Sequence, residues 1–355
     1  MSPGHLCALA IMIILLPCVS KAAWGGECVN RSIDPALKQS PPSTDRAPVI
    51  LHPSLYVTNL AAINEAEESF AIDGYMKIVW HDNRLAVGVA CDTQVLSEGD
   101  IWMPSIEMAN AQRYKRHSYT LKVDSTGLVS YTERFDADLS NHYGLRQFPF
   151  DRQVLMVVLE PFLSPEMTVV FSAGDLGSGL SGESIAGLAA WSIEGITYVP
   201  STVPLYGMAG QIPEARFDIL VARKTGFYIW KVFLPMILMA IIPWSVFWVD
   251  AKEFDWQMKI PIATMLALIA FEFAVSRDLP RVPYITFLDA VFLTCFLFVF
   301  LSIVEIVAVY ALINAEQARL GVRLHWHARW AVPLVFVCTL ALLIPAFFHS
   351  GSPPL

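Results

Sequence analysis

Charged side chains at regular spacing mark the apolar stretch that runs from about Gln257 to Val275. Lys259 stands near its start, and Glu272 and Arg277 stand near its end. Read as a helix, one face of this stretch carries a cation at each end, with small and apolar side chains between them. Such a face suits the wall of an aqueous ion pathway whose hydrophobic constriction closes by excluding water. The members of this stripe are Lys259, Ala263, Leu266, Ala270, Phe273 and Arg277.

The same stripe also fits a packed membrane helix that conducts nothing. Lys259 and Arg277 have long stems, which let their charged ends reach the two interfaces of a bilayer. Periodicity alone therefore leaves a pore wall and a packed helix as open alternatives.

Motifs that would support an enzyme are missing from the sequence. It contains no nucleophile elbow, phosphate-binding loop, HExxH helix or paired-cysteine metal motif. His325 and His327 suggest a metal site, but histidines beside arginines and Trp326 are more typical of a membrane boundary. We therefore expect no enzyme activity, no bound metal and no cofactor.

Composition indicates the kind of scaffold that must position these residues. The chain has 355 residues, of which 55% are hydrophobic and only 16% are charged. A mean hydropathy of +0.50 is too apolar for a soluble enzyme of this size and indicates several membrane spans. The formal net charge of -8 argues against a nucleic-acid partner, because binding phosphates needs a basic face.

Four apolar stretches follow residue 224, and each is long enough to cross a membrane. They cover about 227–249, 257–275, 284–313 and 330–348. About 20 helical residues cross a hydrocarbon core of about 30 Å, so we expect a transmembrane domain over 224–350. The connection between the last two stretches is rich in arginine and should be cytoplasmic. Its arginines are Arg319, Arg323 and Arg329.

The part of the chain before residue 224 has the pattern of an all-β protein. Short runs of alternating polarity, such as Ala71 to Trp80 and Val154 to Leu159, are separated by clusters of Gly, Pro, Asn and Asp. This pattern is typical of a β-sandwich. We expect the sandwich to occupy 46–223, up to an abrupt change in polarity.

The N-terminus resembles an export signal. Residues Leu6 to Val19 form an apolar run, and small residues near Ala22 suit cleavage. We expect a signal peptide over 1–23 and an extension over 24–45, with an uncleaved anchor helix as the alternative. Of the six cysteines, Cys28 and Cys91 lie outside the signal and the spans, and their pairing is left open.

A run inside the expected sandwich resembles the signature loop of the Cys-loop receptors. It reads Phe148-Pro149-Phe150-Asp151-Arg152-Gln153, and Asn141 and Leu155 stand where many members have the flanking cysteines. Absence of that disulfide is a feature of the bacterial members. Similar motifs continue along the chain at Trp102-Met103-Pro104, Glu160-Pro161-Phe162, Pro235, Trp244-Ser245-Val246-Phe247-Trp248 and Leu279-Pro280-Arg281-Val282-Pro283-Tyr284.

This resemblance implies the architecture and the assembly. Members are pentameric ligand-gated ion channels, with an extracellular immunoglobulin-like β-sandwich followed by an all-α domain of four membrane helices. We expect a homopentamer in the bacterial inner membrane, with the N-terminal domain in the periplasm. The second helices would surround a pore for inorganic ions, and agonist sites would lie between neighbouring subunits. Lys259, Glu272 and Arg277 would otherwise face lipid, which is costly.

The resemblance also implies where the agonist binds. One subunit would contribute Glu107, Glu160, Phe162, Tyr198 and Tyr206, and its neighbour would contribute Tyr75, Tyr131 and Arg134. Aromatic rings around a carboxylate can hold an ammonium group by cation–π contacts of about 0.5–2 kcal/mol each, so a small primary amine is the expected agonist. Phe162 and Tyr198 also fit as core and edge residues of the sandwich.

Protons are the alternative stimulus. Carboxylates and an imidazole that titrate near neutral or acid pH stand in the expected extracellular domain. These residues are Glu65, Glu67, Glu68 and His142.

Ion selectivity is ambiguous in the sequence. Leu266 is the expected central hydrophobic ring and Phe273 a second ring nearer the outside. Asp255 stands where cation-selective relatives carry an acid, whereas five copies of Lys259 would repel cations in a narrow passage. We expect a weak preference for cations, with anion conduction as the alternative.

Coupling between the two domains is implied at the signature loop. The loop from Phe148 through Pro149 and Phe150 to Asp151 should face the linker that holds Pro280 and Arg281, with Glu65 and Arg223 beside it. Arg223 also fits as an interfacial anchor of the first span. A non-conducting envelope receptor that only binds a ligand is the alternative function.

Overall fold

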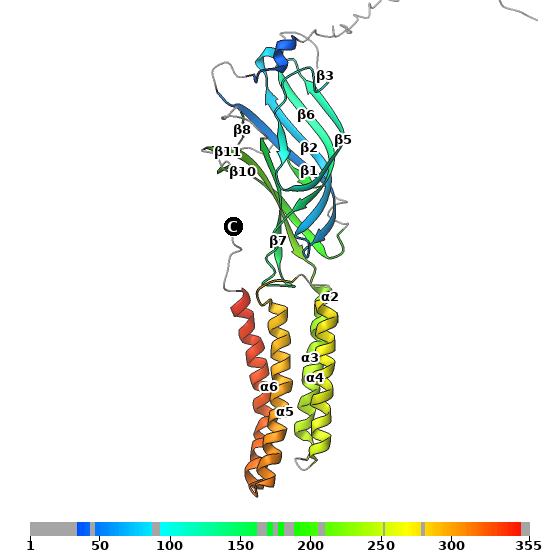
Figure 1. Ribbon diagram of the computed structural model, residues 1–355, viewed down its shortest axis with the longest axis vertical. Helices are drawn as coiled ribbons and strands as arrows, with labels where there is room; N and C mark the ends of the chain where they lie inside the picture. The colour runs from blue at the N-terminus through cyan, green and yellow to red at the C-terminus, as the bar shows by residue number, and fades with distance from the viewer. Residues whose placement is uncertain are drawn as a thin grey trace, which may run out of the picture.

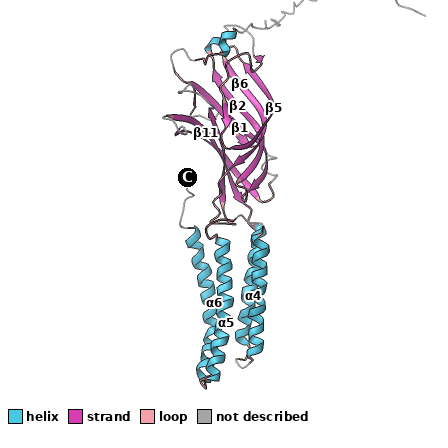
Figure 2. Cartoon of the chain, in the orientation of Figure 1, coloured by secondary structure: helices cyan, strands magenta, loops and turns pink. Residues whose placement is uncertain are grey.

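The chain folds into a strand-rich part followed by a bundle of helices (Figures 1 and 2). The computed structural model describes residues 34–42, 47–86, 93–161, 169–172, 177–180, 188–204, 210–250, 253–277 and 281–348. Several predicted features lie outside the described residues. These are the signal peptide over 1–23, Cys28, Cys91, Phe162, Tyr206 and Pro280.

Two sheets form the strand-rich part. The larger sheet has seven strands in the order β3-β5-β6-β2-β1-β8, with β9 paired to β1, and the smaller sheet has the order β10-β11-β7-β4. The larger sheet contains β1 (Val49–Asn64), β2 (Ser69–His81), β3 (Gln94–Leu96), β5 (Ala111–Val123), β6 (Leu128–Ser140), β8 (Val169–Phe171) and β9 (Gly179–Leu180). The smaller sheet contains β4 (Ile106–Met108), β7 (Arg152–Pro161), β10 (Trp191–Pro204) and β11 (Gln211–Arg223). Short 3-10 turns η1 (Pro35–Lys38) and η2 (Asn83–Leu85) complete this part.

Alternating polarity explains how the two sheets pack. Leu155, Val157 and Leu159 of β7 are buried, and the residues between them are more exposed. The same period of two buries Phe217 and Ile219 of β11. Successive side chains of a strand point to opposite faces, so one face of each sheet supplies the core. The predicted β-sandwich is confirmed.

The first membrane-length helix, Gly226–Trp248, is built from four segments. These are α2 (Gly226–Tyr228), the π-helical η3 (Ile229–Phe233), α3 (Leu234–Ile241) and the 3-10 helix η4 (Ile242–Trp248). Pro235 and Pro243 lie where the hydrogen-bond pattern changes. Proline has no N–H to continue an α-helical ladder, which explains the irregular winding around them.

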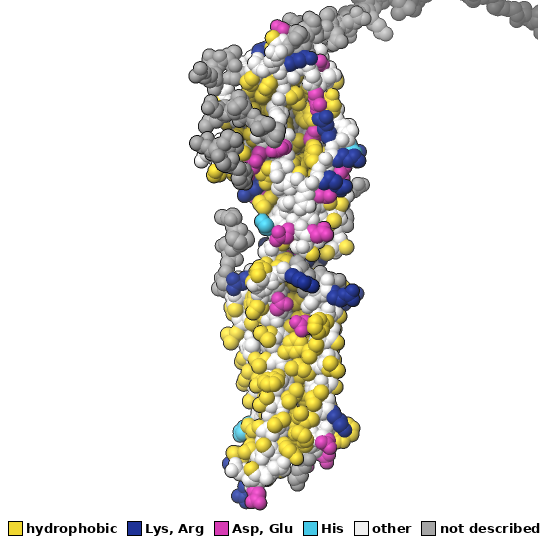
Figure 3. Space-filling model, in the orientation of Figure 1, with side chains coloured by type: hydrophobic (Ala, Val, Ile, Leu, Met, Phe, Trp, Pro, Cys, Tyr) yellow, Lys and Arg dark blue, Asp and Glu magenta, His cyan; other side chains and the backbone are white. Residues whose placement is uncertain are grey.

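The other three helices are regular and long. They are α4 (Phe254–Ser276), α5 (Phe287–Asn314) and α6 (Ala318–Phe348). Thr286 and Asp289 form a capping box that starts α5. All four helices are long and apolar enough to cross a membrane, which confirms the predicted fold class. Hydrophobic side chains cover the visible face of this part, and charged groups gather towards its ends (Figure 3).

The helix boundaries differ from the expected spans at one place that matters. α6 begins at Ala318, whereas the apolar stretch begins at about residue 330. Arg319, Arg323 and Arg329 therefore lie on the first turns of α6 and not in a connection. Arginine, leucine and alanine are good helix formers, so the helix continues although its hydropathy falls.

Candidate functional site

The second membrane helix, α4, has two clearly different faces. Its buried residues are Gln257, Pro261, Thr264 and Leu268, spaced by four, three and four positions. At 3.6 residues per turn these four lie on one side of the helix, opposite the stripe identified in the sequence. In the single chain, every member of that stripe is exposed: Lys259, Ala263, Leu266, Ala270, Phe273 and Arg277.

Large apolar residues on the exposed face are left uncovered by the described part of the chain. Leu266 is 69% exposed and Phe273 is 71% exposed, whereas Leu268 is 0% exposed. Asp255 and Lys259 are both exposed one turn apart near the start of α4. The Lys259 Nζ lies 5.4 Å from the centre of the Trp256 ring.

Three carboxylates meet where β4, β7 and β11 lie side by side. Glu107 of β4 stands directly opposite Glu160 of β7 in the sheet register. Burial raises the pKa of the Glu160 carboxyl, and the negative charges of Glu214 and Glu107 raise it further. Ser201 of β10 donates a hydrogen bond of 2.6 Å to Glu214 across the β10–β11 hairpin. The cluster can attract an ammonium group, or it can take up a proton.

Tyr198 stands beside this hairpin but is held by the sandwich. Its hydroxyl donates a hydrogen bond of 2.7 Å to the carbonyl oxygen of Ser172. Its ring centre lies 5.1 Å from that of the buried Phe217. These contacts correspond to the edge position that the sequence left as an alternative to a ligand contact.

On the larger sheet, a row of residues crosses the outer face. Tyr56, Tyr75 and Arg134 stand opposite one another on β1, β2 and β6, and all three are exposed. Tyr131 lies on the other face of β6 and is buried. The structure therefore brings Tyr75 and Arg134 together and separates both from Tyr131.

Tyr131 instead lines a cavity of about 560 Å³ that is partly open to the surface. Its hydroxyl donates a hydrogen bond of 2.5 Å to the buried Glu133 and accepts one of 3.0 Å from Arg116. Tyr114 also donates to Glu133, and Glu98 pairs with Arg116. Burial and the Glu133 carboxylate raise the pKa of both tyrosine hydroxyls well above their usual value.

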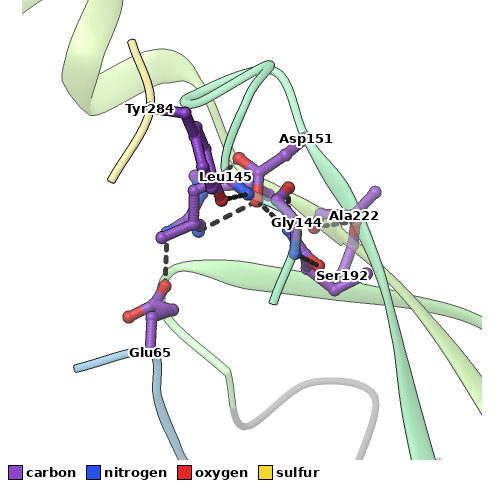
Figure 4. A network of polar contacts seen from close by, with 9 residues as sticks. Glu65, Gly144, Leu145, Asp151, Ser192, Ala222 and Tyr284 are labelled. Atoms are coloured by element: carbon purple, nitrogen blue, oxygen red, sulfur yellow. Dashed lines mark hydrogen bonds and ion pairs between the residues drawn. The ribbon is translucent and has the colours of Figure 1, made fainter. Parts of the chain in front are cut away.

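The junction of the two domains is organised around Arg223, at the end of β11. Two of its partners, Glu65 and Asp151, are labelled in Figure 4. Its Nε and Nη2 donate to the Asp151 oxygens at 2.8 and 3.0 Å, and its Nη1 lies 2.7 Å from Glu65 Oε1. The guanidinium also lies 4.1 Å from the Trp191 ring and 4.6 Å from the Phe148 ring. Burial opposes the charge, but the bonds to Asp151 and Glu65 outweigh it and raise the pKa of Arg223.

Below Arg223, the signature loop and the three residues before it, 145–147, contact three membrane helices. The Tyr284 hydroxyl accepts a hydrogen bond of 3.0 Å from the Leu145 backbone N–H (Figure 4). The Phe287 N–H donates to the Arg146 carbonyl at 2.9 Å, and the Gln147 amide donates to the Phe347 carbonyl at 3.2 Å. The Phe150 ring packs among Phe233, Phe287 and Phe348. Arg281 lines a small hollow beside this loop.

The predicted proton sensors lie at the same end of the sandwich. Glu65 is bound to Arg223, as described above. Glu68 lies 3.3 Å from His142, and both side chains are largely exposed. Glu67 is exposed at the neighbouring position. These four residues therefore face different surroundings and do not form one cluster.

Family comparisons match this arrangement in both domains. Residues 32–203 match the neurotransmitter-gated ion-channel ligand binding domain, and residues 232–338 match the neurotransmitter-gated ion-channel transmembrane region. The chain belongs to the neurotransmitter-gated ion-channel family. This membership confirms the predicted resemblance to Cys-loop receptors, and it confirms a ligand-gated ion channel and not an enzyme.

Individual members of the neurotransmitter-gated family are distant relatives. A proton-gated ion channel of Gloeobacter violaceus is 26% identical over 98% of this chain and 93% of its own length. The gamma-aminobutyric acid receptor subunit beta-4 of Gallus gallus is 23% identical, and the subunit rho-2 of Homo sapiens is 24% identical. The chain covers 65% and 58% of the length of these two subunits.

Four residues with clear roles in the packing of these sites were given no site role from the sequence. Trp191 and Tyr284 contact Arg223 and Leu145, and no local pattern signals contacts between segments so far apart. Glu214 completes the carboxylate cluster from a strand that pairs with β7 only in the fold. Glu133 had one usable signal, because it alternates with Tyr131 on the buried face of β6.

Proposed function

We propose that five copies of this chain form an ion channel with the α4 helices around a central pore. The exposed stripe of α4, which lies opposite its buried face, carries this proposal. A single chain in a bilayer would leave Lys259 and Arg277 facing lipid at a high cost in free energy. A closed ring of five identical subunits turns these charges toward water.

A ligand that binds between neighbouring sandwiches opens this pore. Glu107, Glu160 and Glu214 provide negative charge on one face, and Tyr56, Tyr75 and Arg134 provide aromatic and polar contacts on the other. A small primary amine suits this pair of faces, because carboxylates attract its charge and tyrosine rings hold it by cation–π contacts. Phe162 and Tyr206 belong to the same proposed site.

Proton gating is the second candidate, and two observations favour it. The crowded Glu160 carboxyl takes up a proton at higher pH than an isolated glutamate. In addition, the relative that matches 98% of this chain is a proton-gated ion channel. Protonation would remove repulsion within the cluster and change how the hairpin packs on its neighbour.

The pore favours cations weakly in this proposal. Asp255 attracts cations at the start of α4, and Lys259 opposes them one turn later. Leu266 and Phe273 form two hydrophobic rings that close the pore by excluding water. The sandwich, over residues 46–223, lies in the periplasm, and the start of α6 lies on the cytoplasmic side of a bacterial inner membrane.

Current recording in planar bilayers tests the proposal. The purified protein should carry current when a small amine is added or when the periplasmic side is acidified. Leu266→Ser should give channels that open more easily, because a polar ring no longer excludes water. Leu268→Ser, on the buried face, serves as the matched control. A protein that binds amines or protons without any current would be a non-conducting receptor, and the channel proposal would fail.

A further inference from the structure

A buried ionisable pair lies at the cytoplasmic end of the helical bundle, away from the sites described above. Glu305 of α5 and His325 of α6 are both buried, and His325 Nδ1 lies 2.9 Å from Glu305 Oε1. The other ring nitrogen, Nε2, lies 3.2 Å from the backbone carbonyl oxygen of Val249. Ionisable residues within membrane helices are costly and commonly functional.

Both ring nitrogens of His325 face oxygen atoms that accept hydrogen bonds. A neutral imidazole has only one N–H, whereas the imidazolium has two. Only the protonated ring can therefore donate to Glu305 and to Val249 at the same time. The second oxygen of Glu305, Oε2, is buried and has no hydrogen-bond partner among the described residues, so within them His325 is the side chain that hydrogen-bonds this carboxylate.

The Val249 carbonyl connects this pair to the proposed pore helix. The amide nitrogen of Gln257, on the buried face of α4, donates to Val249 O at 3.3 Å and to Asp250 O at 3.2 Å. Val249 ends the first membrane helix and immediately precedes the turn into α4. The Val249 carbonyl oxygen thus lies within hydrogen-bonding distance of both His325 on α6 and Gln257 on α4.

Few other charges contribute to this contact. Arg329 of α6 is occupied at the neighbouring carbonyl, because its Nε donates to Phe247 O at 2.6 Å. The Phe247 ring lies edge-on to His325 with centres 6.0 Å apart and shields one side of it. Among the described residues, the other titratable side chains at this end of these elements are Arg319, Arg323 and His327 of α6, Tyr310 of α5, Glu316 between α5 and α6, Asp250 and Glu253 before α4, and Asp255 and Lys259 on α4.

We propose that Glu305, His325 and the Val249 carbonyl form a proton-dependent latch that fixes the cytoplasmic end of each subunit. At acid pH in the cytoplasm, the imidazolium links α5 and α6 to the corner before α4. At alkaline pH, the neutral ring keeps only one of the two hydrogen bonds, and the segment around Val249 is no longer linked to both α5 and α6. The channel would therefore respond to cytoplasmic pH separately from any stimulus at the sandwich.

Two readouts test this latch, and only the first rests on the channel function proposed above. In excised patches, cytoplasmic pH is changed from about 5.5 to about 8, across the usual range of histidine, at fixed external pH and agonist. The open-to-closed ratio should change about fivefold, the effect of one lost hydrogen bond. His325→Gln should remove this dependence. His327→Gln, exposed on the same helix, should behave as the parent does.

Hydrogen–deuterium exchange on the purified channel gives the second readout. After correction for the effect of pH on intrinsic exchange, backbone amides around Val249 should be more protected at acid pH in the parent protein. In His325→Gln, the protection should be equal at both pH values. Parental pH dependence that persists in His325→Gln, in either readout, would overturn the latch. A parent without current but with this exchange pattern would refute the channel function and support the latch.

Discussion

Lys259 and Asp255 place opposite charges one turn apart at the entrance of the proposed pore. Neither residue has an ion pair among those found in the described part of the chain, so in the proposed pore both charges would act on passing ions. Five ammonium groups in a narrow passage raise the free energy of a cation there, because the dielectric constant is lower than in bulk water. In the proposed pore, Lys259 is therefore the residue that reduces the preference for cations over anions.

Replacing this lysine should shift the ion preference. In asymmetric NaCl, we expect the reversal potential of Lys259→Gln to move toward the cation equilibrium potential relative to the parent. Lys231→Gln, which removes a lysine from the first membrane helix, should leave the reversal potential unchanged. Identical reversal potentials for Lys259→Gln and the parent would place Lys259 outside the permeation path.

Glu160 should make folding stability depend on pH. A carboxyl whose pKa is raised in the folded protein is harder to ionise there, so it destabilises the fold above that pKa and not at low pH. Glu160→Gln should therefore raise the thermal midpoint at neutral pH but not near pH 4, below the ordinary glutamate value. The gain should be about 0.5 kcal/mol per subunit, because solvent screens this half-buried group.

Thermal unfolding of the purified protein at both pH values measures this effect. Glu67→Gln, at an exposed position outside the cluster, is the matched control and should change neither midpoint. An equal gain for Glu160→Gln at both pH values would show that ionisation of Glu160 is not its cause.

At the scale of the elements, the segment that leads into the signature loop contacts the linker into α5, and we propose that this contact joins ligand binding to pore opening. Tyr284 lies in this linker, and its hydroxyl accepts the Leu145 N–H at 3.0 Å. Tyr284→Phe removes one hydrogen bond, which contributes about 1 kcal/mol. We expect the agonist or proton concentration for half-maximal current to change about fivefold.

Dose–response curves measure this change. Tyr310→Phe provides a control, because Tyr310 stacks on Phe254 at the far end of α5 and its ring remains after the substitution. A half-maximal concentration that is the same for Tyr284→Phe and the parent would show that this hydrogen bond carries no coupling.

Elements with strong periodicity could be predicted from the sequence. Alternation in β7 and β11 follows directly from the need to bury one face, so the sandwich was predictable. The first turns of α6 were not, because hydropathy measures the cost of leaving water and not the tendency to form a helix. The predicted apolar stretch therefore begins only at about Trp330, although the helix starts at Ala318.

Contacts between distant segments set the limit for predicting the sites. Glu65, Asp151 and Arg223 were expected together because the family resemblance placed them so, and the structure brings them within bonding distance. His325 looked like a residue of the membrane boundary. Its partner Glu305 is on another helix, and no sequence pattern links the two.

The whole molecule combines a β-sandwich and a four-helix membrane domain in a chain that matches the neurotransmitter-gated ion-channel family along both parts. One face of α4 has no covering partner among the residues that the structure describes, and the opposite face is buried against neighbouring helices. In a ring of five copies, this face would contact water in the pore and not lipid. We therefore propose that the stripe containing Leu266 lines an aqueous pore.

Cysteine modification along α4 tests this claim most directly. Single cysteines at Ala263, Leu266, Ala270 and Phe273 should react with a charged, water-soluble thiosulfonate in open channels, and the current should change irreversibly. Cysteines at Thr264 and Leu268, on the buried face, should not react. The parent protein shows whether its own cysteines respond. Equal reaction on both faces, or reaction at Thr264 and Leu268 alone, would contradict a pore lined by this helix.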